Sequence, residues 1–375
     1  GWERPEYFEP DRPWRRAGPD QREFGYTKPP YFDRIGQEHQ AFRERVSLID
    51  MSSFGKIEIA GPGALTLLQR LTDNDMDRPD LAVIYTQFLN ERGGVVADIT
   101  ITRLARDRFR LITGAGFIDN DLGWIRAHLL PDDAPVTVRD VTEELTCLGM
   151  WGPKARQVLQ AVTRDDVSNA ACPYMTAKTI DIGGAPVLAQ RVTYVGELGW
   201  ELYMDPAWAT RVWDTLMAAG RPHGIQPGGY KVLDSLRLEK GYKYYSADVT
   251  MLENPYEAGL GFCVRLKKGD FIGRAALLKA KEHGISQRLA TLTIGGSDYL
   301  TIYGGEAVLH DGQVLGRLRS GGYGYTVKKN IGTVYLPVEL VKVGTKLDVD
   351  VMGEMVRAEV AADALHDPEG ARLRV

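Results

Sequence analysis

Apolar positions in the first half of the chain switch between the two-residue spacing of strands and the spacing of helices. Residues 56–60 (Lys-Ile-Glu-Ile-Ala) alternate as a strand does, and after a Gly-Pro pair Leu65, Leu68 and Leu71 recur on one helix face. The same order of strand, Gly-Pro pair and helix returns over residues 147–162. Two copies of one strand–helix unit predict a pseudo-duplicated α+β body.

Between the two copies, the pattern predicts antiparallel strands. Residues 82–90 and 95–103 are β-like runs on either side of a Glu-Arg-Gly-Gly turn, which is a hairpin signal, and residues 108–113 continue it as a meander. Helical spacing predicts further helices. They are expected around a stripe of Ile118, Leu122, Ile125 and Leu129, and near residues 206–219, 228–240 and 273–282.

The pattern changes near residue 286. Six short β-like runs follow, separated by glycine and aspartate turns, and this spacing is typical of a small all-β barrel. The runs are residues 290–294, 306–309, 315–318, 331–336, 346–351 and 355–361. The fold class expected from these patterns is therefore α+β, with pseudo-duplicated antiparallel units and a C-terminal all-β barrel domain.

The first 36 residues are rich in proline, arginine and aromatic residues and show no clear periodicity. We expect an arm that packs over the body and is ordered by its aromatic side chains. These are Trp2, Tyr7, Phe8, Trp14, Phe24, Tyr26, Tyr31 and Phe32. The expected organisation is an arm (1–36), an α+β body of two intertwined domains (37–285) and a β-barrel domain (286–375).

Charge and cysteine usage narrow the classes of function. The net charge is -4 with interspersed signs and no basic stripe, so we expect neither a nucleic acid nor a membrane surface as partner. Cys147, Cys172 and Cys263 are far apart and outside any C-x-x-C spacing, and the six histidines show no metal-ligand spacing. We therefore expect no disulfide framework, no metal and a reduced, cytoplasmic compartment.

Residues 194–201 (Tyr-Val-Gly-Glu-Leu-Gly-Trp-Glu) are the most informative segment for function, and they alternate like a strand. It places Glu197 and Glu201 beside Tyr194 and Trp200, and desolvated carboxylates need solvent, a basic partner or a ligand with donors. A carboxylate can accept from a paired N–H edge while an aromatic ring packs a heterocycle's face, so a pterin ring would suit. The alternative is a solvated hairpin with two surface acids and a core tryptophan.

Asp98 lies in the middle of a predicted strand, and the two-residue period places it on one face with Thr100 and Thr102. One interpretation is a solvated polar face. The other is that Asp98 faces a cavity and handles a proton, because partial burial would raise the pKa of its carboxyl toward the useful range. Tyr85 and Gln87, on the partner strand of the hairpin, would then line the same cavity.

Arg237 lies near the end of a predicted helix, where the helix dipole stabilises a cation, and a capping role is one interpretation. The other is bidentate binding of a carboxylate. Residues 61–64 (Gly-Pro-Gly-Ala) lack the third glycine of a dinucleotide fingerprint, and the proline removes an N–H that a phosphate would need. We therefore do not expect a flavin or nicotinamide to bind through a Rossmann unit of this chain.

Seven segments, in this order, carry a resemblance to a known family: 46–56, 85–94, 194–201, 236–241, 254–261, 270–273 and 320–325. Together they resemble the folate-binding aminomethyltransferase family, which contains the glycine-cleavage T-protein and the C-terminal halves of dimethylglycine and sarcosine dehydrogenases and oxidases. Residues 1–5 (Gly-Trp-Glu-Arg-Pro) and 196–201 look closer to the dimethylglycine dehydrogenase branch, in which the former sequence follows a flavin domain.

The resemblance implies three domains in a cloverleaf around a central hole that holds tetrahydrofolate. It implies that Asp98 is the catalytic carboxylate, acting as general base or orienting acid near N5 and N10 of the folate. The T-protein has two adjacent aspartates in this strand, whereas Ala97 precedes Asp98 here. The assignment of the base therefore depends on the alignment register.

The resemblance also implies the residues that bind the cofactor. Glu201 matches the pterin-binding glutamate, and Tyr194 matches the aromatic residue seven positions before it. Tyr85 matches a pocket tyrosine, and Arg237 matches the arginine near the aminobenzoyl-glutamate portion.

Three functions remain open. The first is a tetrahydrofolate-dependent transferase or demethylase that moves a methyl group from a small methylated amine, sulfonium or methoxy compound to tetrahydrofolate. The second is the tetrahydrofolate-binding half of a flavin-dependent dimethylglycine or sarcosine demethylase. It would form 5,10-methylenetetrahydrofolate from an iminium or formaldehyde delivered by a separate flavoprotein or a removed portion. The third is a non-enzymatic folate-binding regulatory protein.

Overall fold

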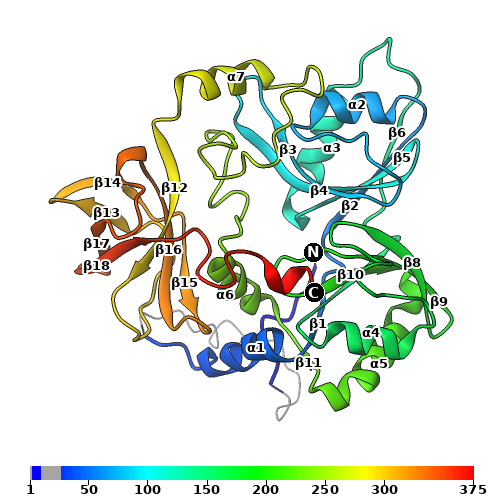
Figure 1. The fold of residues 1–375 in the computed structure, drawn as a ribbon, viewed down its shortest axis with the longest axis horizontal. Helices are drawn as coiled ribbons and strands as arrows, with labels where there is room; N and C mark the ends of the chain where they lie inside the picture. The colour runs from blue at the N-terminus through cyan, green and yellow to red at the C-terminus, as the bar shows by residue number, and fades with distance from the viewer. Residues whose placement is uncertain (1, 10–26) are drawn as a thin grey trace.

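The computed structural model describes residues 2–9 and 27–375. Three β-sheets occupy three corners of the molecule, and helix α6 (Tyr230–Lys240) lies between them (Figure 1). Helices and strands are mixed along the body, whereas the strands of the third sheet follow one another with no α-helix between them. The predicted α+β class is therefore confirmed. Trp14, Phe24 and Tyr26 of the expected arm lie outside the described residues.

The first sheet has the order β3-β4-β5-β2-β6. Its strands are β2 (Gly55–Ala60), β3 (Val83–Leu89), β4 (Val95–Ala105), β5 (Arg108–Thr113) and β6 (Thr137–Asp140). The predicted hairpin and meander are confirmed, because β3, β4 and β5 pair antiparallel in succession. Helices α2 (Ala64–Leu71) and α3 (Ile118–Ala127) share its core, but Leu129 lies beyond the end of α3 and is exposed, so its place on the helix stripe was wrong.

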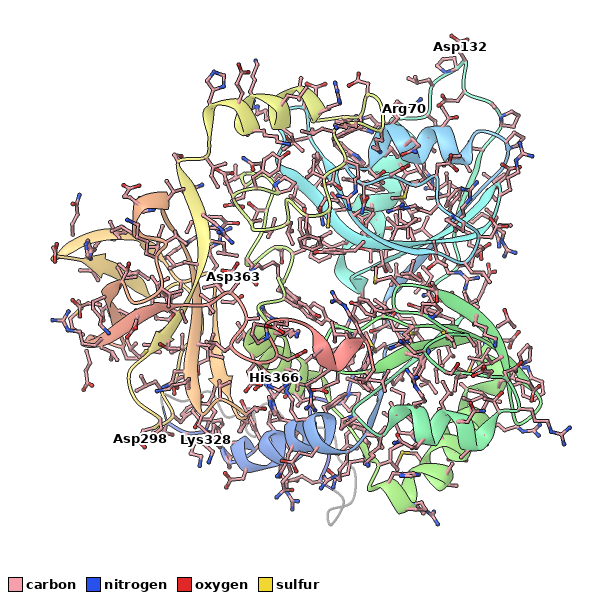
Figure 2. All side chains as sticks on the ribbon, in the orientation of Figure 1. Arg70, Asp132, Asp298, Lys328, Asp363 and His366 are labelled. Atoms are coloured by element: carbon pink, nitrogen blue, oxygen red, sulfur yellow. The ribbon has the colours of Figure 1, made fainter. Side chains whose placement is uncertain are left out.

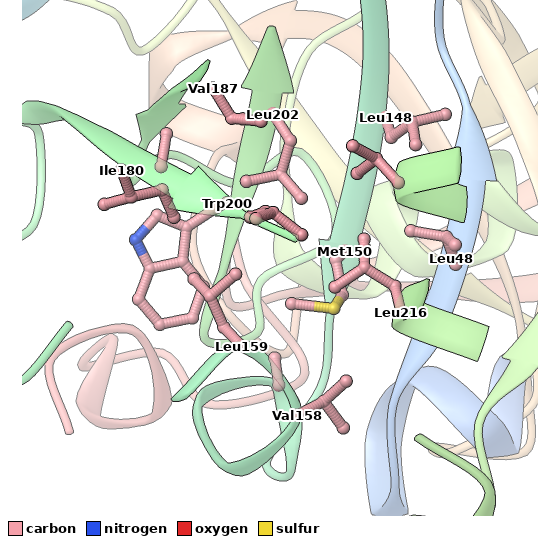
Figure 3. Close-up of a cluster of buried hydrophobic side chains, with 14 of the residues drawn as sticks. Leu48, Leu148, Met150, Val158, Leu159, Ile180, Val187, Trp200, Leu202 and Leu216 are labelled. Atoms are coloured by element: carbon pink, nitrogen blue, oxygen red, sulfur yellow. The ribbon is translucent and has the colours of Figure 1, made fainter. Parts of the chain in front are cut away.

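The second sheet has the order β11-β1-β7-β10-β9-β8. Its strands are β1 (Ser47–Asp50), β7 (Thr146–Trp151), β8 (Ala177–Ile182), β9 (Ala185–Gln190), β10 (Gly199–Met204) and β11 (Gln226–Pro227). Helices α4 (Ala155–Val162) and α5 (Ala209–Gly220) bury one face around Trp200, Met150 and Leu159 (Figure 3). The repeat of strand and helix is confirmed, since β7–α4 follows the order of β2–α2.

One expectation for this sheet was wrong. The segment 194–201 was expected to be a strand throughout, but residues 194–198 form a turn and β10 begins at Gly199. The alternative of two surface acids is also wrong, because Glu197 and Glu201 are 1% and 9% exposed. Trp200 is the core tryptophan that this alternative expected.

The third sheet has the order β14-β13-β17-β18-β12-β16-β15. Its strands are β12 (Gln287–Ile294), β13 (Ala307–His310), β14 (Gln313–Arg317), β15 (Ser320–Gly324), β16 (Lys329–Pro337), β17 (Lys346–Val351) and β18 (Glu354–Ala361). The six predicted runs are strands, and β15 was missed because glycine is depleted in strands. A Cβ on Gly324 would lie 2.9 Å from the Glu239 side chain of α6, so this strand needs glycine for its close approach to the helix.

Two more helices complete the described fold. α7 (Arg274–His283) was predicted, whereas α1 (Phe32–Glu44) begins inside the segment that was expected to be an irregular arm. Aromatic contacts do fix this segment: Tyr7 stacks on Tyr31 with ring centroids 5.3 Å apart, and Phe32 lies 4.7 Å from the Tyr325 ring. α1 therefore packs against both α6 and the third sheet.

A buried group of charges joins these elements; we call it the Arg43 network. Arg43 of α1 donates to Glu197 Oε1 at 3.0 Å and to Glu239 Oε2 of α6 at 3.1 Å. Glu239 Oε1 accepts the backbone N–H of Thr326, in the turn after β15, at 2.7 Å. Arg372, near the end of the chain, donates to Glu197 at 2.7 Å. Three separate segments are therefore tied to two carboxylates.

Two histidines complete the network. His39 Nε2 lies 3.3 Å from Glu239 Oε2, and His366, labelled near α6 in Figure 2, lies 3.2 Å from Glu197 Oε1. Burial alone would raise the pKa of Glu239, but His39, Arg43 and the Val327 N–H hold it at about 2. Glu239 is therefore a carboxylate that stays ionised although it is fully buried.

We predict that Arg43→Met lowers the free energy of unfolding by about 3–5 kcal/mol, because it removes the buried guanidinium that two buried carboxylates share. Urea denaturation measures the change. The matched control is Arg139→Met, which breaks an exposed pair with Glu144 and should cost far less. The pKa of Glu239 lies below its ordinary value of 4.5, so its stabilisation is present above pH 4.5 and is lost toward pH 2. Equal losses in the two variants would contradict this role.

Candidate functional site

The polar face of β4, formed by Asp98, Thr100 and Thr102, is directed at the second sheet. Thr102 Oγ1 donates a hydrogen bond to Gln190 Oε1 at the end of β9, and Thr102 is only 1% exposed. Gln190 in turn pairs in register with Glu201 of β10. The first and second sheets therefore bring their polar faces together, and the interpretation of a fully solvated strand face is wrong.

Asp98 is held by its neighbours on β3. Gln87 Nε2 donates to Asp98 Oδ1 at 2.8 Å, and the Tyr85 hydroxyl also forms a hydrogen bond with this carboxylate. Burial raises the pKa of Asp98 to about 6, although both hydrogen bonds oppose the rise. A carboxylate with this pKa can accept or release a proton near neutral pH.

Tyr85 connects Asp98 to the surface. Its ring stacks on Phe262, with centroids 6.1 Å apart, and Phe262 is 66% exposed. Burial and the charge of Asp98 raise the pKa of Tyr85 well above its ordinary value. Tyr85 therefore remains a hydroxyl donor toward Asp98 at any physiological pH.

Tyr194 lies in the turn before β10, close to the same carboxylate. Its hydroxyl donates to the backbone oxygen of Lys243 at 2.9 Å, and its ring stacks on Tyr242 with centroids 6.2 Å apart. Burial raises the pKa of Tyr194; Arg237 opposes this rise and Asp98 adds to it. The contacts with residues 242 and 243 hold the Tyr194 ring in place.

Glu201 points from β10 to the side of the sheet opposite Trp200. Tyr203, two residues later on the same face, donates its hydroxyl to Glu201 Oε2 at 2.6 Å. Burial raises the pKa of Glu201, while Tyr203 and the ammonium of the fully buried Lys56 lower it. Within the described chain, Glu201 Oε1 has no hydrogen-bond partner, so one oxygen of this carboxylate is open.

Glu197, the other acid of residues 194–201, is part of the Arg43 network. Glu197 accepts from Arg43 and Arg372, so both of its oxygens are used inside the Arg43 network. It fixes the turn that carries Tyr194 and leads into β10. Of the two carboxylates in the motif, only Glu201 keeps an oxygen without a hydrogen-bond partner among the described residues.

Arg237 is 4% exposed, and each of its nitrogens has a protein partner. Nε donates to Asp234 at 2.9 Å, Nη1 to Asp248 at 2.9 Å and Nη2 to Ser320 at 3.1 Å. Arg237 therefore ties α6 to residues 242–248 and to the start of β15. Binding of a ligand carboxylate by Arg237 stays a prediction, and it would use the second N–H of Nη2.

Sequence reasoning missed three side chains of this site. Tyr203 could have been found, because it lies two residues after Glu201 and strand spacing places both on one face. Gln190 requires the pairing register of β9 and β10, and Lys56 requires knowledge that a strand lysine is buried with its ammonium on the backbone oxygens of Ser52 and Thr142. No local pattern signals either of these.

In residues 2–9 and 27–375, no group of three or more His, Cys, Asp or Glu side chains is arranged to hold a metal ion. The three cysteines are free and buried. No helix of the described chain has the length and apolar composition that a membrane span needs.

Comparison with known families explains this arrangement. Residues 1–268 match the model of the GCVT N-terminal domain, and residues 287–367 match the glycine cleavage T-protein C-terminal barrel domain. The chain belongs to the glycine cleavage T-protein family. A solved structure of this family, the glycine cleavage system aminomethyltransferase T from Bartonella henselae, has a TM-score of 0.79 and 25% identity, covering 92% of this chain and 91% of the other.

Curated relatives in this family fall into two groups. The aminomethyltransferase of Shouchella clausii (strain KSM-K16) is 36% identical over 90% of both chains. Mitochondrial dimethylglycine dehydrogenase of Mus musculus is 34% identical over 100% of this chain but only 42% of the relative. The 4-methylaminobutanoate oxidase (formaldehyde-forming) of Paenarthrobacter nicotinovorans is 35% identical over 94% of this chain and 42% of its own length. The chain thus spans less than half of these dehydrogenase and oxidase relatives.

We predict that Tyr85→Phe raises the pKa of Asp98 above its value of about 6, because the variant removes a hydrogen bond that favours the ionised carboxylate. Titration of the Asp98 carboxyl by carbon-detected NMR measures the shift. Tyr323→Phe, which removes a hydroxyl from the third sheet, is the control and should leave Asp98 unchanged. An unshifted titration in Tyr85→Phe would show that this hydroxyl does not act on Asp98.

Proposed function

We propose that this chain is a tetrahydrofolate-dependent one-carbon transferase that accepts its one-carbon unit from a small methylated substrate. The observation that carries the proposal is that two carboxylates with different environments, Asp98 and Glu201, lie on the facing sides of two sheets. Asp98 has a pKa of about 6, suited to proton transfer, and Glu201 has one open oxygen, suited to recognition. Membership of the T-protein family supports a folate as the acceptor.

The polar atoms of the site fit tetrahydrofolate. Gln87 Oε1 and Gln190 Nε2 are buried without a partner in the described chain, and such groups in native proteins call for a ligand or water. Glu201 adds an open acceptor for the amino and N–H groups of a pterin. The rings of Tyr85 and Tyr194 supply aromatic surface for its flat face.

Bound tetrahydrofolate supplies the nitrogen that takes the one-carbon unit. Glu201 orients the cofactor by holding the pterin edge, and Tyr194 packs beside it. Asp98 holds or moves the proton at that nitrogen, with its charge state set by Tyr85 and Gln87. Such positioning can contribute on the order of 7–11 kcal/mol to lowering a barrier.

A second candidate concerns the source of the carbon unit. The match to dimethylglycine dehydrogenase covers all of this chain, whereas the match to the aminomethyltransferases covers 90%. This favours a chain that receives an iminium or formaldehyde from a flavoprotein that oxidises a methylated amine. The product would then be 5,10-methylenetetrahydrofolate, whereas direct methyl transfer would give 5-methyltetrahydrofolate.

Mass spectrometry of folate products distinguishes the two sources. The chain is incubated with tetrahydrofolate and either a panel of methylated amines, sulfonium compounds and methoxyaromatics, or formaldehyde. Direct transfer predicts 5-methyltetrahydrofolate from one compound with no electron acceptor present. The flavoprotein-coupled function predicts no product from the panel and faster 5,10-methylenetetrahydrofolate formation from formaldehyde than without protein. If neither product exceeds the protein-free control, the transferase proposal is wrong.

We predict that Glu201→Gln weakens tetrahydrofolate binding by a few kcal/mol, because the amide replaces an ionised acceptor with a neutral one. Isothermal titration calorimetry gives the affinity. Glu144→Gln, in the exposed turn between β6 and β7, is the control and should bind as the parent does. Unchanged affinity in Glu201→Gln would remove this residue from the site.

We predict that Asp98→Asn keeps tetrahydrofolate affinity within roughly tenfold but lowers turnover by ~10²–10⁴, the usual range for a positioned acid or base. Affinity and product formation are measured on the same preparation. Full turnover in this variant would show that Asp98 is a polar residue of the strand face with no role in catalysis.

A further inference from the structure

Gln190 is a fully buried side chain whose amide is only half satisfied. Its Oε1 accepts the hydroxyl of Thr102 from the opposite sheet, so the side chain points away from its own sheet toward β4. Its Nε2 is buried and has no hydrogen-bond partner among the described residues. Leaving such a donor unpaired costs about 1–3 kcal/mol, so a group that binds there would recover this free energy.

The neighbour of this amide is Glu201. The two residues are directly paired between β9 and β10, so their side chains lie on one face with Cβ atoms about 4.5–5.5 Å apart. Tyr203 fixes Glu201 Oε2, which retains a second lone pair, and Oε1 is open. The sheet therefore presents two carboxylate acceptors beside one amide donor.

This order of hydrogen-bonding groups has a chemical complement. A ligand edge must offer two adjacent N–H groups followed by a carbonyl oxygen. The 2-amino-4-oxo edge of a reduced pterin has this order: the 2-amino group, the ring N3–H and the 4-oxo group. A carboxylate takes the first two, and an amide N–H is needed for the third.

We propose that Gln190 is a specificity-determining residue that binds the 4-oxo group of the pterin edge held by Glu201. This inference rests on the proposed folate function. Thr102 is a positioning residue, because its hydroxyl holds the amide oxygen and so directs the amide nitrogen to the ligand. A 4-amino edge presents a donor to this N–H and lacks the N3 hydrogen in its neutral form, so the site disfavours it.

The test compares the affinities of tetrahydrofolate and its 4-amino analogue by isothermal titration calorimetry. The parent chain should prefer tetrahydrofolate by about 5- to 150-fold, the range that follows from one buried hydrogen bond of about 1–3 kcal/mol. Gln190→Met, which keeps the side-chain length, should lose most of this preference by weakening tetrahydrofolate binding alone. Gln160→Met, on the exposed side of α4, is the matched control and should keep it.

Two further variants separate recognition from folding. Gln190→Glu keeps size and polarity but replaces the donor with an acceptor, so it should shift the preference toward the 4-amino analogue. Thr102→Val removes the hydrogen bond that orients the amide but keeps the amide donor itself, so it should weaken the preference for tetrahydrofolate only in part. Circular dichroism and the melting temperature verify that each variant is folded.

The outcomes distinguish this inference from the function on which it rests. If the parent binds tetrahydrofolate and both Gln190 variants keep the parent's preference, the role of Gln190 is wrong and the folate function stands. If the parent binds neither compound, both are wrong. Loss of the preference in Thr102→Val as complete as in Gln190→Met would assign the effect to sheet packing and would overturn the recognition role.

Discussion

A single buried guanidinium, that of Arg43, is the interaction on which the rest of the structure depends. It lies between Glu197, in the turn before β10, and Glu239, on α6. Buried ion pairs often add little net stability, because desolvation offsets the attraction, but they fix geometry strictly. Here the fixed geometry is that of the turn carrying Tyr194, so the Arg43 network helps to fix the position of this tyrosine.

The site itself depends on packing between sheets. Asp98 and Glu201 belong to different sheets, and no strand pairing connects them. Their relative position is set by the contact of Thr102 with Gln190 and by a buried cluster that contains Ile112 of β5 and Tyr203 of β10. The pKa values of the two carboxylates can therefore be tuned separately, each by its own neighbours. Asp98 is tuned by β3 and Glu201 by its own strand neighbour Tyr203.

Local patterns predicted those features that depend on local physics. Two-residue spacing gave the polar face of β4, and helical spacing gave most helices, because both follow from backbone geometry. Spacing alone could not show that Glu197 is paired with Arg43, whereas Glu201 keeps one oxygen without a hydrogen-bond partner. It also missed β15, whose glycines are explained by the close approach of α6 and of neighbouring side chains such as Ile302 and Ile331. The folate assignment came from resemblance, and the structure added the half-satisfied amide of Gln190.

The position of Glu239 has a consequence for how this fold can be recombined. Its carboxylate sits on α6, yet the two amide groups it accepts, those of Thr326 and Val327, belong to the turn between β15 and β16. A barrel excised at the start of β12 would leave these amides without their acceptor, and α6 would keep a desolvated charge. The barrel and α6 therefore depend on each other, and α6 depends on α1 through Arg43 and His39. Chimeras between relatives should take α1, α6 and the barrel from one parent.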